Sequence, residues 1–243
     1  MASRYDSTRG GSARGTRYAD VLAPRLNPAE PVLDVGAGTG VVGEALGQRG
    51  FGVIGIDLSF DMLALARGRM AASVVADAAR LPFGPGTIRQ AYSVWVLQMT
   101  ADAATTLAEV ARVLAPGGCY AVVSGVLAPA DDDIGRLYDS IWERIDPDGR
   151  RDDRRERLRE LAPGAGLTVE EALPLPPTYH DQSPLEAAEF VESRAPFCLW
   201  ALDAARWKAE IVPVVDALRA LPDPDRRRHR RTVRDLTVLK RDR

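Results

Sequence analysis

A glycine-rich stretch near the N-terminus, VLDVGAGTGVVG at residues 32–43, is typical of a loop whose backbone approaches a ligand closely. Counted from Gly38 it matches the G-x-G-x-x-G pattern of dinucleotide-binding loops, and counted from Gly36 it reads G-A-G-T-G. In both frames Asp57, 21 residues beyond Gly36, follows the next apolar strand and is placed to accept hydrogen bonds from ribose hydroxyls. The loop therefore predicts an adenosine cofactor, and both a dinucleotide and another adenosine compound remain open.

Two carboxylates favour the frame that starts at Gly36. In the dinucleotide frame the first strand would run through residues 32–37 and bury Asp34 in its middle, where a carboxylate is costly unless it is satisfied. In the other frame the strand ends at Val35, and Asp34 lies at its rim, within reach of a ligand. Asp77 follows the third strand, where its carboxylate can accept a hydrogen bond from an adenine amine.

The elements that must position these residues alternate between strands and helices over the first half of the chain. Because several apolar runs have no polar face, we expect a parallel sheet covered by helices. The C-terminal part of the chain offers a further pair of strands, at 167–173 and 232–240. The simple dinucleotide-binding fold has no such pair. The fold class we predict is α/β: a Rossmann-like, doubly wound, seven-stranded sheet with an antiparallel C-terminal strand and a helical cap. The pattern predicts strands at 32–35, 51–57, 73–76, 88–94, 119–123, 167–173 and 232–240, and helices at 18–26, 60–69, 103–114 and 204–221.

We expect a single domain over residues 1–243, because no linker or internal repeat divides the chain. Aromatic residues in its second half favour a closed, largely apolar pocket under the cap: Trp142, Phe190, Phe197, Trp200 and Trp207. The domain is predicted to consist of a flexible N-terminal lid at 1–17, a cofactor-binding core at 18–125, a helical substrate cap at 126–166 and 177–231, and a terminal strand pair at 167–176 and 232–240.

The charge and cysteine content of the chain indicate which kinds of partner it is expected to bind. The net charge is −2, so no global field attracts nucleic acid. We interpret the basic run Arg226–Arg231 as a solvated loop before the last strand, with a phosphate-binding patch as the alternative. The two cysteines, Cys119 and Cys198, are expected as reduced thiols, and no cluster suggests a metal site. With no signal sequence and no membrane span evident, we expect a cytoplasmic protein.

Five ordered motifs resemble the class I S-adenosylmethionine-dependent methyltransferases, of the small-molecule, UbiE-like (methyltransferase-11) type. VLDVGAGTG resembles their first motif, GIDLSxxML the second and ADAxxLPF the third. The segment from Pro82 to Met99 aligns with their fourth-strand region, and LAEVARVLAPGG resembles the helix and turn before strand five. The resemblance covers roughly residues 30–125 and implies S-adenosylmethionine as the cofactor and S-adenosylhomocysteine as the product.

Residue by residue, the resemblance implies a cofactor site around the glycine loop. Asp57 would accept from the ribose hydroxyls, and Tyr5 resembles the first member of an N-terminal Tyr-Asp pair that closes over the cofactor. The other implied contacts are Asp34, Gly36, Ala37 and Gly38 at the methionine and ribose, Leu58 and Met62 on the adenine, Asp77 and the Ala78 backbone at its amine, and Val94 beside the methionine.

Near the acceptor the sequence departs from the family pattern. Arg89 replaces an Asp that usually opens strand four, and Gln98 and Met99 stand where histidines are frequent. Trp95 occupies a position that is usually small or acidic. We expect Trp95, Gln98, Trp142 and Trp200 to line the acceptor pocket.

Methyl transfer from a sulfonium is an in-line displacement, so the protein's main task is alignment. A general base is needed only if the acceptor must lose a proton. His180 is the candidate, with Asp181 to orient it, and the alternative is a surface histidine in a turn.

We therefore expect an enzyme, a methyltransferase acting on oxygen, nitrogen or carbon of a small molecule. The alternatives are an RNA methyltransferase that grips phosphates with Arg226–Arg231, and a protein that binds S-adenosylmethionine without transferring its methyl group. Both a monomer and a homodimer remain open.

Overall fold

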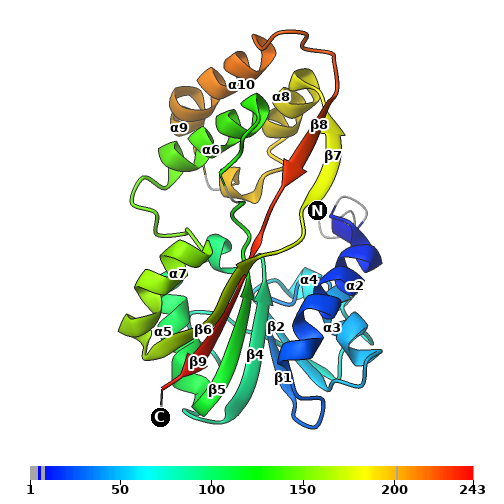
Figure 1. The fold of residues 1–243 in the computed structure, drawn as a ribbon, viewed down its shortest axis with the longest axis vertical. Helices are drawn as coiled ribbons and strands as arrows, with labels where there is room; N and C mark the ends of the chain where they lie inside the picture. The colour runs from blue at the N-terminus through cyan, green and yellow to red at the C-terminus, as the bar shows by residue number, and fades with distance from the viewer. Residues whose placement is uncertain (1–4, 7–8, 128, 201, 243) are drawn as a thin grey trace.

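The computed structural model describes residues 5–6, 9–127, 129–200 and 202–242, and it confirms the predicted α/β sheet. Seven strands lie in the order β3-β2-β1-β4-β5-β9-β6 (Figure 1). From β3 to β5 all neighbours are parallel, and β9 runs antiparallel to both β5 and β6. The strands are β1 (Val32–Val35), β2 (Val53–Asp57), β3 (Ala72–Val75), β4 (Ile88–Val94), β5 (Leu114–Val123), β6 (Leu167–Pro174) and β9 (Asp235–Arg241).

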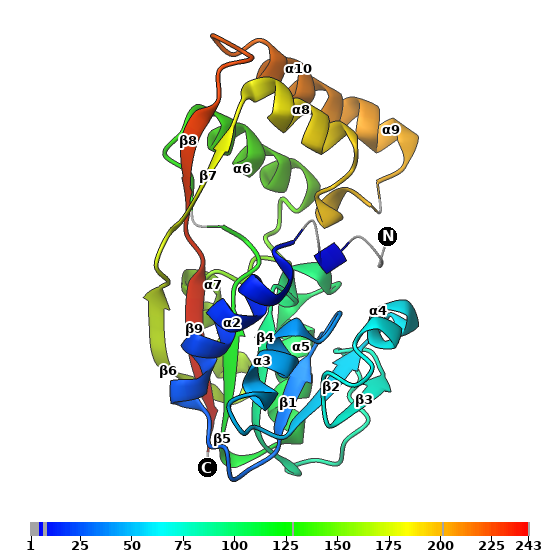
Figure 2. The same cartoon turned by 90° about the vertical axis from the view of Figure 1, so that its right-hand side faces the viewer.

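Helices cover both faces of the sheet (Figure 2). α2 (Gly11–Leu22) and α3 (Val41–Gly47) pack on one face, and α5 (Ala103–Val113) and α7 (Arg155–Leu161) on the other. Consecutive strand residues therefore enter opposite hydrophobic clusters, as Ala91 and Tyr92 do on β4. This two-sided burial explains why the strands read as continuous apolar runs. The shorter helices are α4 (Phe60–Leu65), the 3-10 turns η1 (Ala23–Arg25), η2 (Leu97–Met99), η3 (Ala162–Ala165) and η4 (Phe197–Leu199), and the π-helix η5 (Trp207–Ile211).

The N-terminal helix α2 begins at Gly11, seven residues before the predicted start, so residues 11–17 are helical rather than part of a flexible lid. Its apolar face, Tyr18, Ala19 and Leu22, is buried. A side chain at Gly15 would collide with the backbone carbonyl of Val41, so this glycine lets α2 lie directly against the start of α3. Packing against α3 thus compensates for the poor helix propensity of a Gly- and Ser-rich segment.

A cap lies beyond the carboxyl ends of the parallel strands and has a hydrophobic core of its own (Figures 1 and 2). Its first helix has Asp132 as its N-cap, and the Asp132 carboxylate accepts from the Gly135 N–H at 2.8 Å. Ser183 and Glu186 form a capping box at the start of the next helix. The cap helices are α6 (Asp133–Ile145), α8 (Pro184–Glu192), α9 (Ala204–Arg206) and α10 (Val212–Arg219), with η5 joining the last two.

The cap also contains strands, so the prediction that residues 177–231 are helical was wrong in part. β7 (Thr178–Gln182) and β8 (Arg228–Thr232) form an antiparallel pair that continues upward from β6 and β9 (Figure 1). The basic run is therefore not a solvated loop, because most of it forms β8. No helix in the described part of the chain is long and apolar enough to cross a bilayer.

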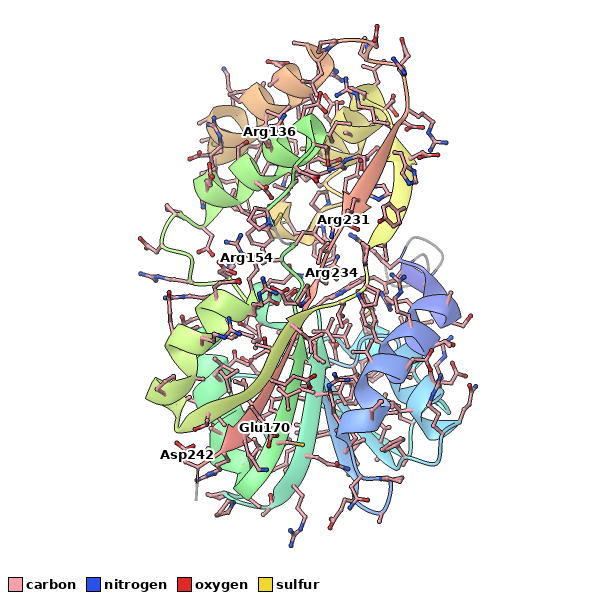
Figure 3. All side chains as sticks on the ribbon, in the orientation of Figure 1. Arg136, Arg154, Glu170, Arg231, Arg234 and Asp242 are labelled. Atoms are coloured by element: carbon pink, nitrogen blue, oxygen red, sulfur yellow. The ribbon has the colours of Figure 1, made fainter. Side chains whose placement is uncertain are left out.

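Acidic residues of the cap neutralise most of the basic run. Arg230 is 3% exposed, donates to Asp132 at 2.9 Å and to the Gln182 side chain at 2.7 Å, and lies over the Tyr138 ring. The other pairs are Arg226–Asp223, Arg227–Glu186, Arg228–Asp133 and His229–Asp181. Arg231, labelled on β8 in Figure 3, is exposed and makes no ion pair with any described residue. The run joins β8 to the cap helices, and little of its charge is left for phosphates.

Replacing Arg230 should destabilise the cap. Arg230→Ala leaves Asp132 and Gln182 without their shared donor in a buried position, so we expect a loss of about 2–4 kcal/mol in the free energy of unfolding. Arg231→Ala on the same strand should change it by less than about 0.5 kcal/mol. Urea unfolding of both variants measures the difference, and equal losses would contradict the pairing described here.

Candidate functional site

The glycine loop between β1 and α3 has the geometry predicted for the frame that starts at Gly36. β1 ends at Val35. Gly36, Gly38 and Gly40 all have positive φ, of 74°, 56° and 75°. A Cβ at Gly36 would lie 2.5 Å from a Val96 methyl group, whereas nothing lies within 4 Å of one at Gly38. Gly36 is therefore required by packing, and Gly38 borders open space where a ligand can approach the backbone.

Asp57 ends β2 and is tied to this loop. One carboxylate oxygen accepts from the Gly38 N–H and the other from the Ser59 N–H, each at 2.8 Å. These bonds fix the carboxylate beside the loop and leave each oxygen with capacity for a further donor. A carboxylate held in this way can accept from the two hydroxyls of a ribose, as predicted.

The predicted adenine contacts surround an exposed apolar surface at the start of α4. Leu58 is 70% exposed and Met62 is partly buried. Phe60, which the sequence reasoning did not select, is 69% exposed beside them. Asp77 is exposed just after β3, accepts from the Ala79 N–H at 2.9 Å, and follows the strand as predicted. Because exposed apolar side chains gain free energy when they are covered, this surface favours the binding of a flat ligand.

Asp34 lies one residue before the end of β1, and its side chain is buried, not open to solvent at the rim. It is 3% exposed, and the Tyr92 hydroxyl donates to it at 2.6 Å. Burial raises the pKa of Asp34 to about 7, although the bond from Tyr92 acts in the opposite direction. An acid with this pKa can ionise fully when a cation binds next to it.

The N-terminal segment docks on the glycine loop. The Thr39 hydroxyl donates to the Asp6 carboxylate at 2.5 Å, and Arg69 donates both to Asp6 at 2.9 Å and to the Thr39 carbonyl at 2.7 Å. Neighbouring Tyr5 is thereby held beside the loop, with the Arg14 guanidinium 5.0 Å from its ring centroid. The prediction named Tyr5 alone; its pairing with an acidic neighbour was the signal for Asp6, and no signal pointed to Arg69.

Comparisons with known proteins agree with this geometry. A family model described as a methyltransferase domain matches residues 33–122. The demethylmenaquinone methyltransferase of Mycolicibacterium gilvum (strain PYR-GCK) is 38% identical over 122 residues, which are 49% of this chain and 54% of that protein. The enzyme of the same name from Mycolicibacterium vanbaalenii is 37% identical over 151 residues, 60% of this chain and 66% of that one. The chain thus spans between about half and two thirds of the curated relatives it matches.

The fold of the whole chain agrees as well. A Bacillus halodurans C-125 protein assigned as a methyltransferase has a crystal structure that matches with a TM-score of 0.62 at 19% identity, over 96% of this chain and 99% of that one. Over residues 33–122 the chain matches the methyltransferase-domain family, and its relatives support a class I S-adenosylmethionine-dependent methyltransferase. S-adenosylmethionine is the cofactor of this family, and the open space at Gly38, the fixed Asp57 carboxylate and the exposed Leu58 fit it.

The acceptor side of the methyltransferase begins at the end of β4. Val94 is partly buried there, and Trp95 has φ of 63°, a left-handed conformation that is strained for tryptophan. Its ring lies 4.1 Å from the Arg234 guanidinium carbon and meets Tyr18 edge-on at 5.6 Å. Figure 3 labels Arg234 where the last strand passes from the cap into the sheet. Strain of this kind is found at functional sites, and the pocket role of Trp95 stays a prediction.

The other predicted pocket residues are spread over the carboxyl edge and the cap. Gln98 is 4% exposed, and its side-chain oxygen has no partner among the described residues. It lies on η2, which contacts η4 of the cap. Trp142 packs on the cap core, whereas Trp200 is 42% exposed and donates to the Arg194 carbonyl at 2.8 Å. Their role as pocket walls stays a prediction.

His180 lies on β7 in the cap. His180 is exposed at the surface of the cap, but partial loss of its hydration lowers its pKa below the usual value and the charge of Arg230 lowers it further. Asp181 does not orient it: its carboxylate pairs with His229 at 2.9 Å, since neighbouring strand residues point to opposite faces. The described residues contain no group of acidic, histidine or cysteine side chains that could hold a metal ion.

Asp34 should make stability depend on pH. Its folded pKa of about 7 exceeds its ordinary value of 3.8, so the folded state binds an extra proton between these values. The contribution of Asp34 to the free energy of unfolding therefore falls as pH rises through this range. Asp34→Asn, which can still accept from Tyr92, should flatten that fall in urea unfolding measured across the range. An unchanged slope would show that another group causes it.

Proposed function

We propose that this protein transfers the methyl group of S-adenosylmethionine to a small molecule held between the carboxyl edge of the sheet and the cap. The observation that carries the proposal is the placement of the cap, whose η4 turn contacts η2, the turn that follows β4 in the chain. A ligand in that position is enclosed on two sides, which suits a small acceptor better than a polymer. The indole of Trp95, which has the Arg234 guanidinium 4.1 Å from its ring, follows β4 at this edge of the sheet.

The comparisons support a small-molecule acceptor. Both curated relatives named above are called demethylmenaquinone methyltransferases. The Arg226–Arg231 run gives little support to the RNA alternative, because every member except Arg231 pairs with an acidic residue of the cap. A hydroxylated aromatic or quinol acceptor would be of the same chemical class as the compound in the names of these relatives.

The residues of this chain act mainly by positioning. When bound, S-adenosylmethionine supplies a methyl group on a sulfonium that is already a good leaving group. Asp57 and the glycine loop would hold the ribose, and Trp95 and Gln98 would lie on the acceptor side. The N-terminal segment, anchored by Asp6, covers the loop and limits access of water. In this proposal, His180 accepts the acceptor's proton where that proton must leave.

Labelled-methyl transfer tests the function. We expect radiolabel from S-adenosylmethionine to appear in a demethylated naphthoquinol, with one S-adenosylhomocysteine formed per methyl group. Asp57→Ala should lower kcat/KM by about 10- to 100-fold, because the ribose hydroxyls lose their acceptor. Asp61→Ala, an exposed acid in the first turn of α4, is the matched control and should match wild type. Tight S-adenosylhomocysteine binding with no transfer to any of a panel of acceptors would favour a non-catalytic binder.

Replacing His180 tests the proton step. With a hydroxyl acceptor at saturation, His180→Ala should lower kcat by about 100-fold or more, while cofactor affinity stays unchanged. His229→Ala is the control, because it removes the other histidine of the same strand pair, the partner of Asp181. Turnover by His180→Ala close to that of wild type would show that alignment alone carries the reaction.

A further inference from the structure

A cavity lies between the N-terminal helix and the segments that join the sheet to the cap. Its volume is about 360 Å³, which is within the range of small-molecule sites. The residues that line it belong to α2 and to the segments around the β6–β7 and β8–β9 connections. The cavity is therefore separate from the glycine loop and from the apolar surface on α4, and the proposed function does not use it.

One wall of this cavity holds a cation that has no acidic partner. The Nη1 group of Arg234 donates to the carbonyls of Ser124 at 3.2 Å and Gly125 at 2.5 Å. Among the described residues Arg234 forms no ion pair, and its Nε and Nη2 groups have no hydrogen-bond partner. Burial lowers the pKa of this guanidinium, because water solvates its charge poorly here. Since buried charges are normally paired, the position favours an anion supplied from outside the chain.

A second unused donor lies beside Arg234. Tyr18 is 4% exposed, and its ring meets Trp95 edge-on at 5.6 Å, while Arg234 lies 4.1 Å from the same indole. The Tyr18 hydroxyl has no hydrogen-bond partner among the described residues, although it is not sealed off from solvent. Most buried polar side chains are hydrogen-bonded. The cavity is the open space that Tyr18 lines, so a ligand there can take up this donor.

The rest of the lining suits a small acid with an apolar body. Arg17 is exposed and adds a second positive charge, whereas the carboxylate of Asp20 is already paired with Arg49 at 2.5 Å. Leu175 and Pro176 supply apolar surface. Guanidinium groups bind carboxylates through charge-assisted hydrogen bonds, which are stronger than bonds between neutral groups. The combination of free donors, positive charge and apolar wall thus matches a carboxylate on an apolar molecule.

We propose that this cavity binds the carboxylate of a small apolar acid through the guanidinium of Arg234 and the hydroxyl of Tyr18. The inference does not depend on the proposed function, because the cavity lies outside the predicted cofactor contacts. The same chemistry would serve a carboxylate on the methyl acceptor and a carboxylate on a separate small molecule. Both residues pack on Trp95, so an acid bound here contacts the neighbours of the predicted acceptor side.

Calorimetry with benzoate and with its neutral isostere benzamide tests the site. An excess of S-adenosylhomocysteine fills the predicted cofactor site, so that benzoate cannot bind there. Wild type should bind benzoate about 10- to 100-fold more tightly than benzamide, because only the carboxylate pairs with the guanidinium. Equal affinities for the two probes, or no binding of benzoate, would overturn the proposal.

Two substitutions separate the roles of the donors. Tyr18→Phe should weaken benzoate binding by about 10-fold. It should leave the midpoint of urea unfolding unchanged, because the hydroxyl has no protein partner to lose. Arg234→Met keeps an apolar stem against Trp95 and should remove the preference for benzoate over benzamide. Arg231→Met, an exposed arginine outside the cavity, is the matched control and should keep the wild-type preference.

The outcomes distinguish this site from the cofactor assignment. Tyr18→Phe that binds benzoate as tightly as wild type contradicts the proposal even if Arg234→Met is too unstable to measure. Wild type that prefers benzoate but does not bind S-adenosylhomocysteine supports the site and overturns the cofactor assignment. In the methyl-transfer assay, benzoate that raises the KM of the acceptor assigns the site to the acceptor's own carboxylate. Benzoate that binds without competing assigns it to a separate acid.

Discussion

The hydrogen bond from the Gly38 N–H to the Asp57 carboxylate joins the loop after β1 to the end of β2, and the cofactor half of the protein is arranged around it. The donor, Gly38, is a glycine with positive φ, and the acceptor, Asp57, is an acidic residue at the last position of β2. The bond requires that the two strands be parallel neighbours, because only then do their carboxyl ends meet at one edge. The apolar surface at Leu58 and the docked N-terminal segment both border this pair of elements.

A second constraint acts on the cap, which is joined to the sheet partly through the strands that leave β6 and enter β9 (Figure 1). Strands that project beyond a sheet need partners, and here they pair with each other and bury one arginine, Arg230, against Asp132. The cap core and this charge network hold η4 against η2. The elements proposed to form the acceptor side are far apart in the chain, whereas the predicted cofactor contacts lie mostly in its first third.

That difference explains how much could be predicted from the sequence. The glycine loop, Asp57 and Asp77 follow from local patterns, because strand ends and turns are short-range features. The start of α2 could not be predicted, since its stability comes from the contact of Gly15 with Val41. The basic run was misinterpreted because its acidic partners lie as far as 98 residues away. The buried state of Asp34 depends on Tyr92, another distant residue.

A crystal structure of the complex with S-adenosylhomocysteine tests the central claim most directly. The account predicts the ribose hydroxyls within hydrogen-bond distance of Asp57, the adenine between Leu58 and Met62 with its amine at Asp77, and the amino-acid part against the loop at Gly36 to Gly38. Density for the ligand at another place, or with its adenine toward Trp95, would contradict it. So would a complex in which the Asp57 carboxylate keeps its two backbone bonds and makes no contact with the ligand.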